Sequence, residues 1–174
     1  MKRRILLVFL IIAGLIVLTG CGNKISSTTN SSNRGNEKEI VSSMKIGNID
    51  LDLNRSGSFN AISYKYPENA MASNVGTYSV MDVMNGEELV VRIAMYFYEN
   101  KTMGDVNAGA GLSSVDAIEY NNNVWNVYEG TKDGKKVINY VTQEGDDSYT
   151  ITFISDNDTT NFSNEFMKTV KFNR

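Results

Sequence analysis

From Met44 to Arg174 the dominant period of apolar residues is two, and turn-forming residues interrupt the pattern about every ten positions. This period places alternate side chains on opposite faces of a strand, which is typical of antiparallel sheets. Asn85-Gly86 and Asp133-Gly134 mark hairpins, because the central residues of such tight turns need positive φ angles. The sequence therefore predicts an α+β fold, with an antiparallel sheet of about six to seven strands covered by short helices.

The expected elements can be placed along the chain. Strands are predicted at residues 49–53, 59–66, 77–84, 88–98, 124–129, 136–143 and 148–155. Thr102 and Asp105 have the spacing of a capping box, which predicts a short helix reaching Ala110. A second helix is expected after Asp158 or Thr159, because the apolar residues beyond them form one stripe that suits packing on the sheet. That stripe consists of Phe162, Phe166, Met167 and Val170.

The segment 88–98 is apolar on both faces apart from Arg92, so we expect an interior strand with helical or loop layers on both sides of the sheet. Alternation places Arg92 on the same face as Tyr96 and Tyr98. One interpretation makes these three residues a ligand-facing patch. The other has Arg92 lying over aromatic rings and reaching water or a carboxylate such as Glu88.

The first 20 residues have the pattern of a signal peptide. Lys2, Arg3 and Arg4 precede an apolar run of 14 residues, 5–18. A helix of that length spans about 21 Å, which is short of the hydrocarbon core of about 30 Å. We therefore expect a cleaved leader rather than a permanent membrane span, with the folded part on the extracytoplasmic side.

Leu18-Thr19-Gly20-Cys21 follows the apolar run and contains the only cysteine of the chain. This tetrapeptide resembles the lipobox of bacterial lipoproteins. The resemblance implies that Cys21 is the lipidation site, that it carries a diacylglyceryl group, and that the leader is cut just before it. Acyl chains such as palmitate contribute about 0.8 kcal/mol per buried CH₂, so two or more would hold the protein at the cell membrane. The alternative is that Cys21 is a free thiol or the last small residue of an ordinary leader.

Residues 21–43 are expected to be a flexible tether between Cys21 and a single globular domain at 44–174. Within residues 22–43, 12 of the 22 positions are Ser, Thr or Asn, and only Ile25, Ile40 and Val41 are large and apolar. Such a segment cannot bury enough apolar surface to offset the entropy lost on ordering.

Composition excludes several classes of function. The chain has no histidine, which removes Ser-His-Asp and Cys-His arrangements and imidazole zinc sites. From Cys21 onward 14 basic side chains face 20 acidic ones, a net charge of −6, which argues against a nucleic-acid partner. Gly109-Ala110-Gly111 lacks the lysine of a phosphate-binding loop. We expect no cofactor.

Carboxylate clusters are the remaining candidates for chemistry. Asp156-Asn157-Asp158 begins like a calcium loop, but Asn161 and Met167 stand where such a loop needs Gly and Glu, so helix capping explains these residues better. Asp146 and its acidic neighbours lie in an expected turn. Asp50 and Asp52 share a strand face and would need further ligands. No catalytic residue and no metal ligand is assigned.

The order of the elements between about Gly57 and Phe172 resembles the PsbP-like fold. The resemblance rests on Tyr66-Pro67, Asn123-Val124-Trp125-Asn126-Val127-Tyr128, Tyr149-Thr150-Ile151-Thr152-Phe153 and Val170-Lys171-Phe172. It implies an α/β/α sandwich and a non-catalytic extracytoplasmic module, with no shared active site and hence no functional residue to transfer.

These observations favour a lipid-anchored protein whose domain binds an envelope protein or a small ligand without chemistry. The alternative is a carboxylate- or metal-dependent envelope hydrolase, which would require acids from distant strands to converge. A structural or assembly role in the envelope is a third possibility.

Overall fold

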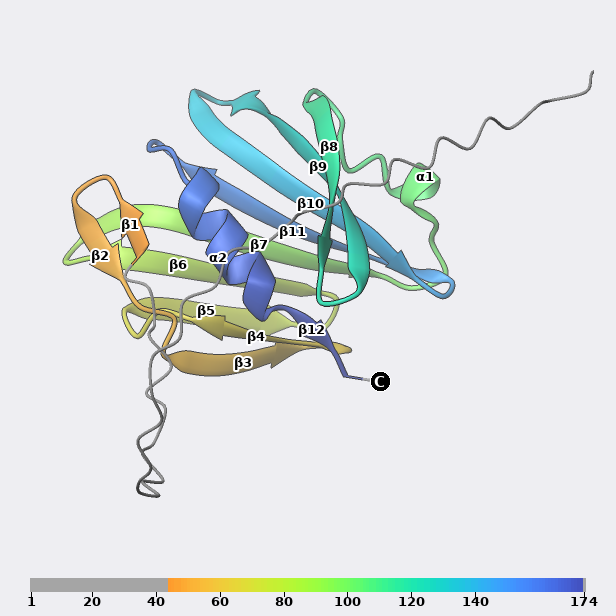
Figure 1. The fold of residues 1–174 in the computed structure, drawn as a ribbon, viewed down its shortest axis with the longest axis horizontal. Coiled ribbons are helices and arrows are strands. Elements are labelled where there is room, and N and C mark those ends of the chain that lie inside the picture. The colour runs from red at the N-terminus through yellow and green to blue at the C-terminus, as the bar shows by residue number, and fades with distance from the viewer. Residues whose placement is uncertain (1–43, 174) are drawn as a thin grey trace, which may run out of the picture. The chain divides into compact units, whose positions relative to one another are not determined.

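The structure is a computed structural model that describes residues 44–173 (Figure 1). The predicted signal peptide at 1–20, the lipidation site Cys21 and the tether up to residue 43 lie outside the described residues, so these remain predictions. Neither helix within 44–173 has the length and apolar character needed to cross a bilayer.

A seven-stranded antiparallel sheet forms the centre of the fold, with the strand order β5-β6-β7-β11-β10-β9-β8. Its strands are β5 (Ala70–Val75), β6 (Tyr78–Asn85), β7 (Glu88–Tyr98), β8 (Ser113–Tyr120), β9 (Asn123–Lys132), β10 (Lys135–Glu144) and β11 (Asp147–Ser155). Every neighbouring pair is antiparallel. The α+β class with an antiparallel sheet is therefore confirmed.

Two smaller sheets accompany the large one. The first pairs β1 (Met44–Ile46) with β2 (Ile49–Leu51), and the second has the order β12-β4-β3, with β3 (Arg55–Phe59), β4 (Ile62–Tyr66) and β12 (Lys171–Phe172). The last strand of the chain thus pairs with a strand about a hundred residues earlier, with Phe172 opposite Ile62.

Helix α2 (Thr160–Thr169) packs its apolar stripe into the core. Phe162, Phe166 and Met167 are completely buried, and Val170 follows at the end of the helix. The Phe166 ring contacts Phe153 of β11 at 5.4 Å and Tyr64 of β4 at 5.6 Å between ring centroids. The helix therefore joins the large sheet to the three-stranded sheet, as Figure 1 shows.

Helix α1 (Met103–Val106) is shorter than predicted. The backbone N–H of Thr102 donates to the Asp105 carboxylate at 3.1 Å, which confirms one half of the expected capping box. Asn107 then takes a left-handed conformation with φ 45°, which ends the helix before Ala110.

Several other predictions were wrong. The predicted strand at 59–66 is a hairpin, because Asn60 adopts φ 49° and turns the chain between β3 and β4. β7 is an interior strand between β6 and β11, as predicted, but its face away from α2 is not fully covered, since Arg92 and Tyr96 are exposed. The turn between β6 and β7 is centred on Gly86 and Glu87, and of these Gly86 has the positive φ.

Candidate functional site

A cavity of about 340 Å³ lies on the sheet face opposite α2. Its floor comes from β7, β10 and β11, and its wall comes from the segment 106–112 that follows α1. We call it the Tyr96 cavity. It is lined by Ala94, Tyr96, Tyr98, Val106, Asn107, Ala108, Ala110, Leu112, Lys132, Val137, Asn139, Thr150, Thr152 and Ile154.

Two residues of the predicted patch, Tyr96 and Tyr98, line this cavity. Their ring centroids lie 6.1 Å apart, and the Tyr96 ring also contacts Tyr78 at 4.4 Å. The three tyrosines form a row of aromatic rings on one sheet face, and Tyr96 keeps 36% of its surface exposed. Such a row offers flat apolar surface with phenol groups at its edge.

Arg92, the third residue of the patch, does not line the cavity. Its guanidinium forms a two-point ion pair with Asp82 on the neighbouring strand β6, with Nε–Oδ1 and Nη2–Oδ2 both at 2.7 Å. Hydrogen bonding to Asp82 raises the pKa of Arg92 above its ordinary value. A carboxylate does hold Arg92, but Asp82 takes the place that the sequence suggested for Glu88.

The phenol of Tyr96 is held in its neutral form. Burial, followed by a hydrogen bond with Tyr78, raises the pKa of Tyr96 to about 12. At neutral pH it can therefore donate or accept a hydrogen bond but does not act as a phenolate base or nucleophile.

Polar residues in the floor hold the wall of the cavity in place. Thr152 Oγ1 donates to Asn139 Oδ1 at 2.9 Å, and Asn139 Nδ2 donates to the backbone oxygen of Ala108 at 2.5 Å. Asn139 is buried, so this contact fixes the 106–112 segment onto β10. Among the described residues that line the cavity, Lys132 is the one basic side chain and none has a carboxylate. This set of groups suits binding by stacking and hydrogen bonding.

Glycines allow the wall to lie close to the sheet. A Cβ atom on Gly109 would fall 2.5 Å from ring atoms of Tyr128, and one on Gly130 would fall 3.0 Å from Leu112 Cδ2. Both positions therefore depend on the absence of a side chain for the present packing. Gly109 in the wall and Gly130 in β9 thus allow the wall to lie against the sheet.

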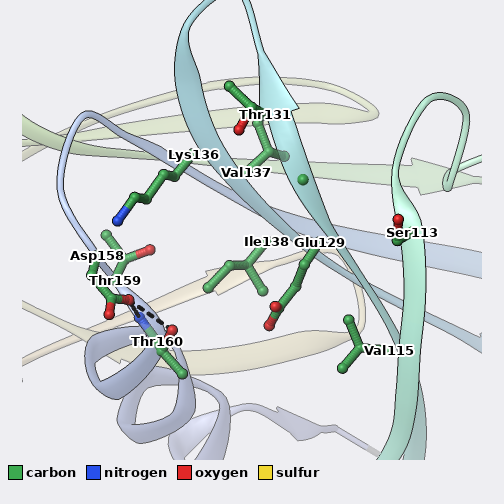
Figure 2. Close-up of a pocket in the computed structure, with 11 residues that line it drawn as sticks. Ser113, Val115, Glu129, Thr131, Lys136, Val137, Ile138, Asp158, Thr159 and Thr160 are labelled. Carbon is green, nitrogen blue, oxygen red and sulfur yellow. Dashed lines mark hydrogen bonds between the residues drawn. The ribbon is translucent and has the colours of Figure 1, made fainter.

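A second cavity, of about 480 Å³, lies between the first turn of α2 and strands β8, β9 and β10 (Figure 2). Its lining contains both basic and acidic residues, namely Lys136, Glu129 and Asp158. Asp158 Oδ1 accepts hydrogen bonds from the backbone N–H and the hydroxyl of Thr160, at 3.0 and 2.7 Å. These bonds lower the pKa of Asp158. Asp158 thus binds the first backbone N–H of α2, as a capping side chain does, although the N-cap residue itself is Thr159, which makes no side-chain capping hydrogen bond.

Three of the other acidic residues named above make contacts within the fold. Lys135 pairs with Asp156 at 2.7 Å, Lys45 pairs with Asp50 at 3.2 Å, and Asp147 accepts from the backbone of Asn100 at 2.9 Å. Within residues 44–173 no three acidic, histidine or cysteine side chains gather closely enough to hold a metal ion.

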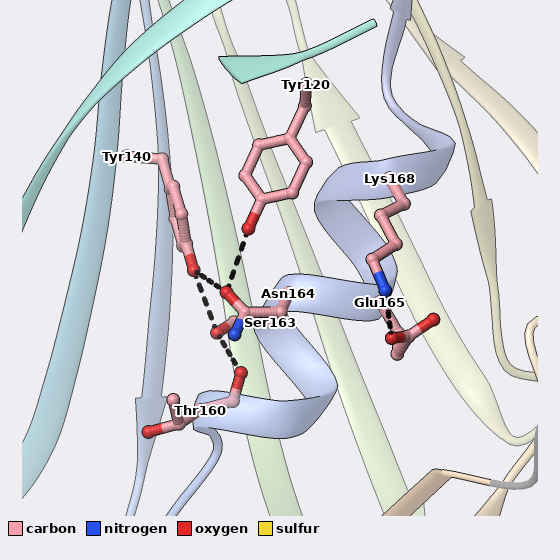
Figure 3. A network of polar contacts seen from close by, with 7 residues as sticks. All are labelled: Tyr120, Tyr140, Thr160, Ser163, Asn164, Glu165 and Lys168. Carbon is pink, nitrogen blue, oxygen red and sulfur yellow. Dashed lines mark hydrogen bonds and ion pairs between the residues drawn. The ribbon is translucent and has the colours of Figure 1, made fainter. Parts of the chain in front are cut away.

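A polar network fastens α2 to the sheet (Figure 3). The phenols of Tyr120 and Tyr140 donate to Asn164 Oδ1 at 2.9 and 3.0 Å, and Tyr140 also contacts Ser163 Oγ at 3.1 Å. Burial raises the pKa of both tyrosines, so both remain donors. Ser163 in turn donates to the backbone oxygen of Thr160. The network therefore links the sheet to the first turns of α2, and we assign it a structural role.

Sequence reasoning missed the wall segment and the floor residues Asn139, Thr150 and Thr152. A signal for part of the floor is present in β11, where Thr150 and Thr152 alternate with Tyr149, Ile151 and Phe153. The wall has a weaker signal, the glycine-rich run after Thr102. Trp125, which belongs to one of the motifs named above, is buried and stacks on Phe172.

Comparisons with known proteins do not assign this chain to a family. No family model and no curated protein matches it. Among solved structures, a crystal structure from Bacteroides thetaiotaomicron VPI-5482 is similar, with 9% identity and a TM-score of 0.44, over 66% of this chain and 46% of that one. This chain thus spans less than half of that protein. The solution structure of cyanobacterial PsbP from Synechocystis sp. PCC 6803 has 13% identity and a TM-score of 0.48, over 68% of this chain and 91% of that one.

Proposed function

We propose that this protein is a lipoprotein of the cell membrane, anchored through acylated Cys21, whose extracytoplasmic domain binds a small ring-containing ligand in the Tyr96 cavity without catalysing a reaction. The observation that carries the binding role is the lining itself. Tyr96 and Tyr98 offer stacking surfaces, the floor offers hydroxyl and amide groups, and the one charged residue is Lys132.

The chemistry of the lining narrows the ligand. Aromatic rings bind flat or ring-shaped molecules through their faces, and a cavity of about 340 Å³ is at the lower end of small-molecule sites. Lys132 would favour a ligand with a negative group near the mouth of the cavity. The proposed class is therefore a single sugar ring, a nucleobase or an aromatic carboxylate.

The binding role is tested by saturation-transfer NMR with panels of monosaccharides, nucleobases and aromatic carboxylates. At least one panel should give a signal that Tyr96→Ala removes. Tyr66→Ala is the matched control, because Tyr66 lies on β4 outside the cavity lining. Signals that Tyr96→Ala leaves unchanged, or no signal from any panel, would refute the proposed ligand class.

The anchor is tested separately in cells fed a clickable palmitate analogue. Cys21→Ser should lose the acyl label and leave the membrane fraction. A second variant restores a thiol one residue later, with Gly22→Cys in the Cys21→Ser background, and should remain unlabelled because the thiol is out of register with the lipobox. Label that persists in Cys21→Ser would show that another residue is modified and would overturn the anchor.

A further inference from the structure

The two edges of the seven-stranded sheet differ in their protection against pairing with another strand. β8 carries Asp116 and Glu119, and its register shifts between Ser114 and Asp116. Charges and bulges of this kind normally block edge-to-edge association. β5 has neither, since residues 70–75 contain no charge and no proline and pair with β6 without a shift.

The β5 edge also exposes apolar side chains. Met71 is 64% exposed and Val75 is 70% exposed, and all of residues 71–75 are accessible. Met71 and Val75 project from the same sheet face, because side chains alternate between the two faces and these residues are an even number of positions apart. An uncharged edge with exposed apolar residues is the type that accepts a further strand.

The hydrogen-bonding pattern between β5 and β6 shows which backbone N–H and C=O groups of β5 remain available to pair with another strand. The N–H of Met84 on β6 donates to the backbone oxygen of Asn69 at 3.3 Å. Both polar groups of a residue in an antiparallel ladder point to the same side, and successive residues alternate. Continuing this alternation along β5 directs the N–H and C=O groups of Ala72 and Asn74 away from β6, toward the open edge.

We propose that β5 pairs antiparallel with β5 of a second copy of this chain, about a two-fold axis through Ser73, so that the two sheets become continuous. A two-fold axis normal to the sheet brings residues of the same face opposite each other. In this register Ala72 lies opposite Asn74 of the second copy, and their outward backbone groups form hydrogen-bonded pairs. Met71 lies opposite Val75 of the second copy, so both exposed apolar side chains gain a partner.

The absence of charge on β5 favours a second copy as the occupant. A two-fold pairing places each residue near its own equivalents, so a charged strand would bring like charges together. A pair of six-residue strands is nevertheless small beside the roughly 1,200–2,000 Å² of stable interfaces. We therefore expect a weak dimer, whose population rises with protein concentration.

Cysteine crosslinking of the full chain in cell membranes tests both the pairing and its register. Ser73→Cys should form a disulfide-linked dimer under mild oxidation, because Cα atoms of a non-hydrogen-bonded pair lie about 4.5 Å apart, within disulfide range. Met71→Cys and Val75→Cys should crosslink when the two variants are co-expressed. Each alone should not, since its equivalent lies about four residues away along the strand.

Two controls accompany these variants. The unaltered chain reports any disulfide through Cys21, its only cysteine, and Ser113→Cys places the same exposed thiol on the β8 edge. Equal dimer yields from Ser73→Cys and Ser113→Cys would mean random collision and would overturn the proposal. So would a Val75→Cys dimer as abundant as the mixed pair.

A proline variant separates loss of pairing from loss of folding. Ala72→Pro removes an outward N–H and should leave the β5–β6 ladder intact, as edge prolines do. Combined with Ser73→Cys, it should reduce dimer yield at least tenfold while the melting midpoint stays unchanged. Dimer that persists in this variant would contradict β5 pairing. Met71→Pro, which removes an inward N–H, should instead lower the melting midpoint.

Discussion

Gly109 is the residue on which the wall of the Tyr96 cavity most depends. Gly109→Ala should destabilise the protein by about 1–3 kcal/mol, because the new methyl group would lie 2.5 Å from the Tyr128 ring and force one of them to move. Gly104→Ala is the matched control. Its Cβ would meet nothing closer than Thr102 Oγ1 at 3.7 Å, and alanine in a helix gains up to about 1 kcal/mol over glycine. Denaturant unfolding should show opposite signs, and equal stability of the two variants would refute the close approach.

Asp158 is expected to stabilise α2 in a way that depends on pH. Hydrogen bonds from Thr160 lower its pKa below the ordinary 3.8, so its contribution is present above pH 3.8 and is lost as the pH falls through the lower folded value. Asp158→Ala should cost about 0.5–2 kcal/mol at neutral pH. The loss should disappear in strong acid, as measured by unfolding at a series of pH values.

Asp156→Ala is the control for that series, because Asp156 pairs with Lys135 on the exposed surface and should contribute about 0–1 kcal/mol. A larger cost for Asp156→Ala than for Asp158→Ala would contradict the capping role.

The sequence could place the predicted patch only in part, for a physical reason. Strand parity alone puts Arg92, Tyr96 and Tyr98 on one face, and in the structure Tyr96 and Tyr98 line a shared cavity whereas Arg92 does not. Parity cannot show which neighbouring strand supplies a partner, and the pairing of β6 with β7 brings Asp82 opposite Arg92. The ion pair then removes Arg92 from the candidate site.

Among the helices and strands, the sequence predicted correctly those features that depend on neighbouring residues, such as tight turns and the apolar stripe of a helix. Asp133 and Gly134 both adopt positive φ, as the turn required, and the stripe of α2 is buried throughout. The hairpin at Asn60 was missed because no glycine marks it. β5 and β8 were missed because exposed edge strands lack the apolar alternation that reveals a half-buried strand.

The attachment of α2 to the sheet should weaken in alkaline solution. Burial raises the folded-state pKa of Tyr140, so its contribution to stability is fully present below pH 10 and is lost as the pH rises beyond that value. Tyr140→Phe should cost about 0.5–1.5 kcal/mol at neutral pH, the value of a lost hydrogen bond. It should also show a smaller further loss between neutral and strongly alkaline pH than the unaltered protein. An identical alkaline loss in both would assign the effect to other groups.

Within residues 44–173, the two faces of the large sheet differ in how far they are buried. The α2 side holds the buried aromatic residues and the network of Tyr140, and it is closed. Within residues 44–173 the 106–112 segment covers the opposite side where it crosses β10, and the row of Tyr78, Tyr96 and Tyr98 stays partly exposed. The buried contacts that stabilise the fold therefore lie mainly on the α2 side, whereas the opposite side has exposed aromatic surface that could bind a ligand.

This division predicts that the stability of the whole protein does not depend on divalent cations. Within residues 44–173 no three acidic side chains gather closely enough to hold a metal ion, and Asp50, Asp147 and Asp158 already bind a lysine or backbone groups. A cation that binds only the folded state raises the melting midpoint by mass action. We therefore expect the same midpoint for the full chain in Ca²⁺, in Mg²⁺ and in EDTA. A saturable rise in either cation, reversed by EDTA, would require several acids to converge on one ion and would favour the metal-dependent hydrolase over the binding module.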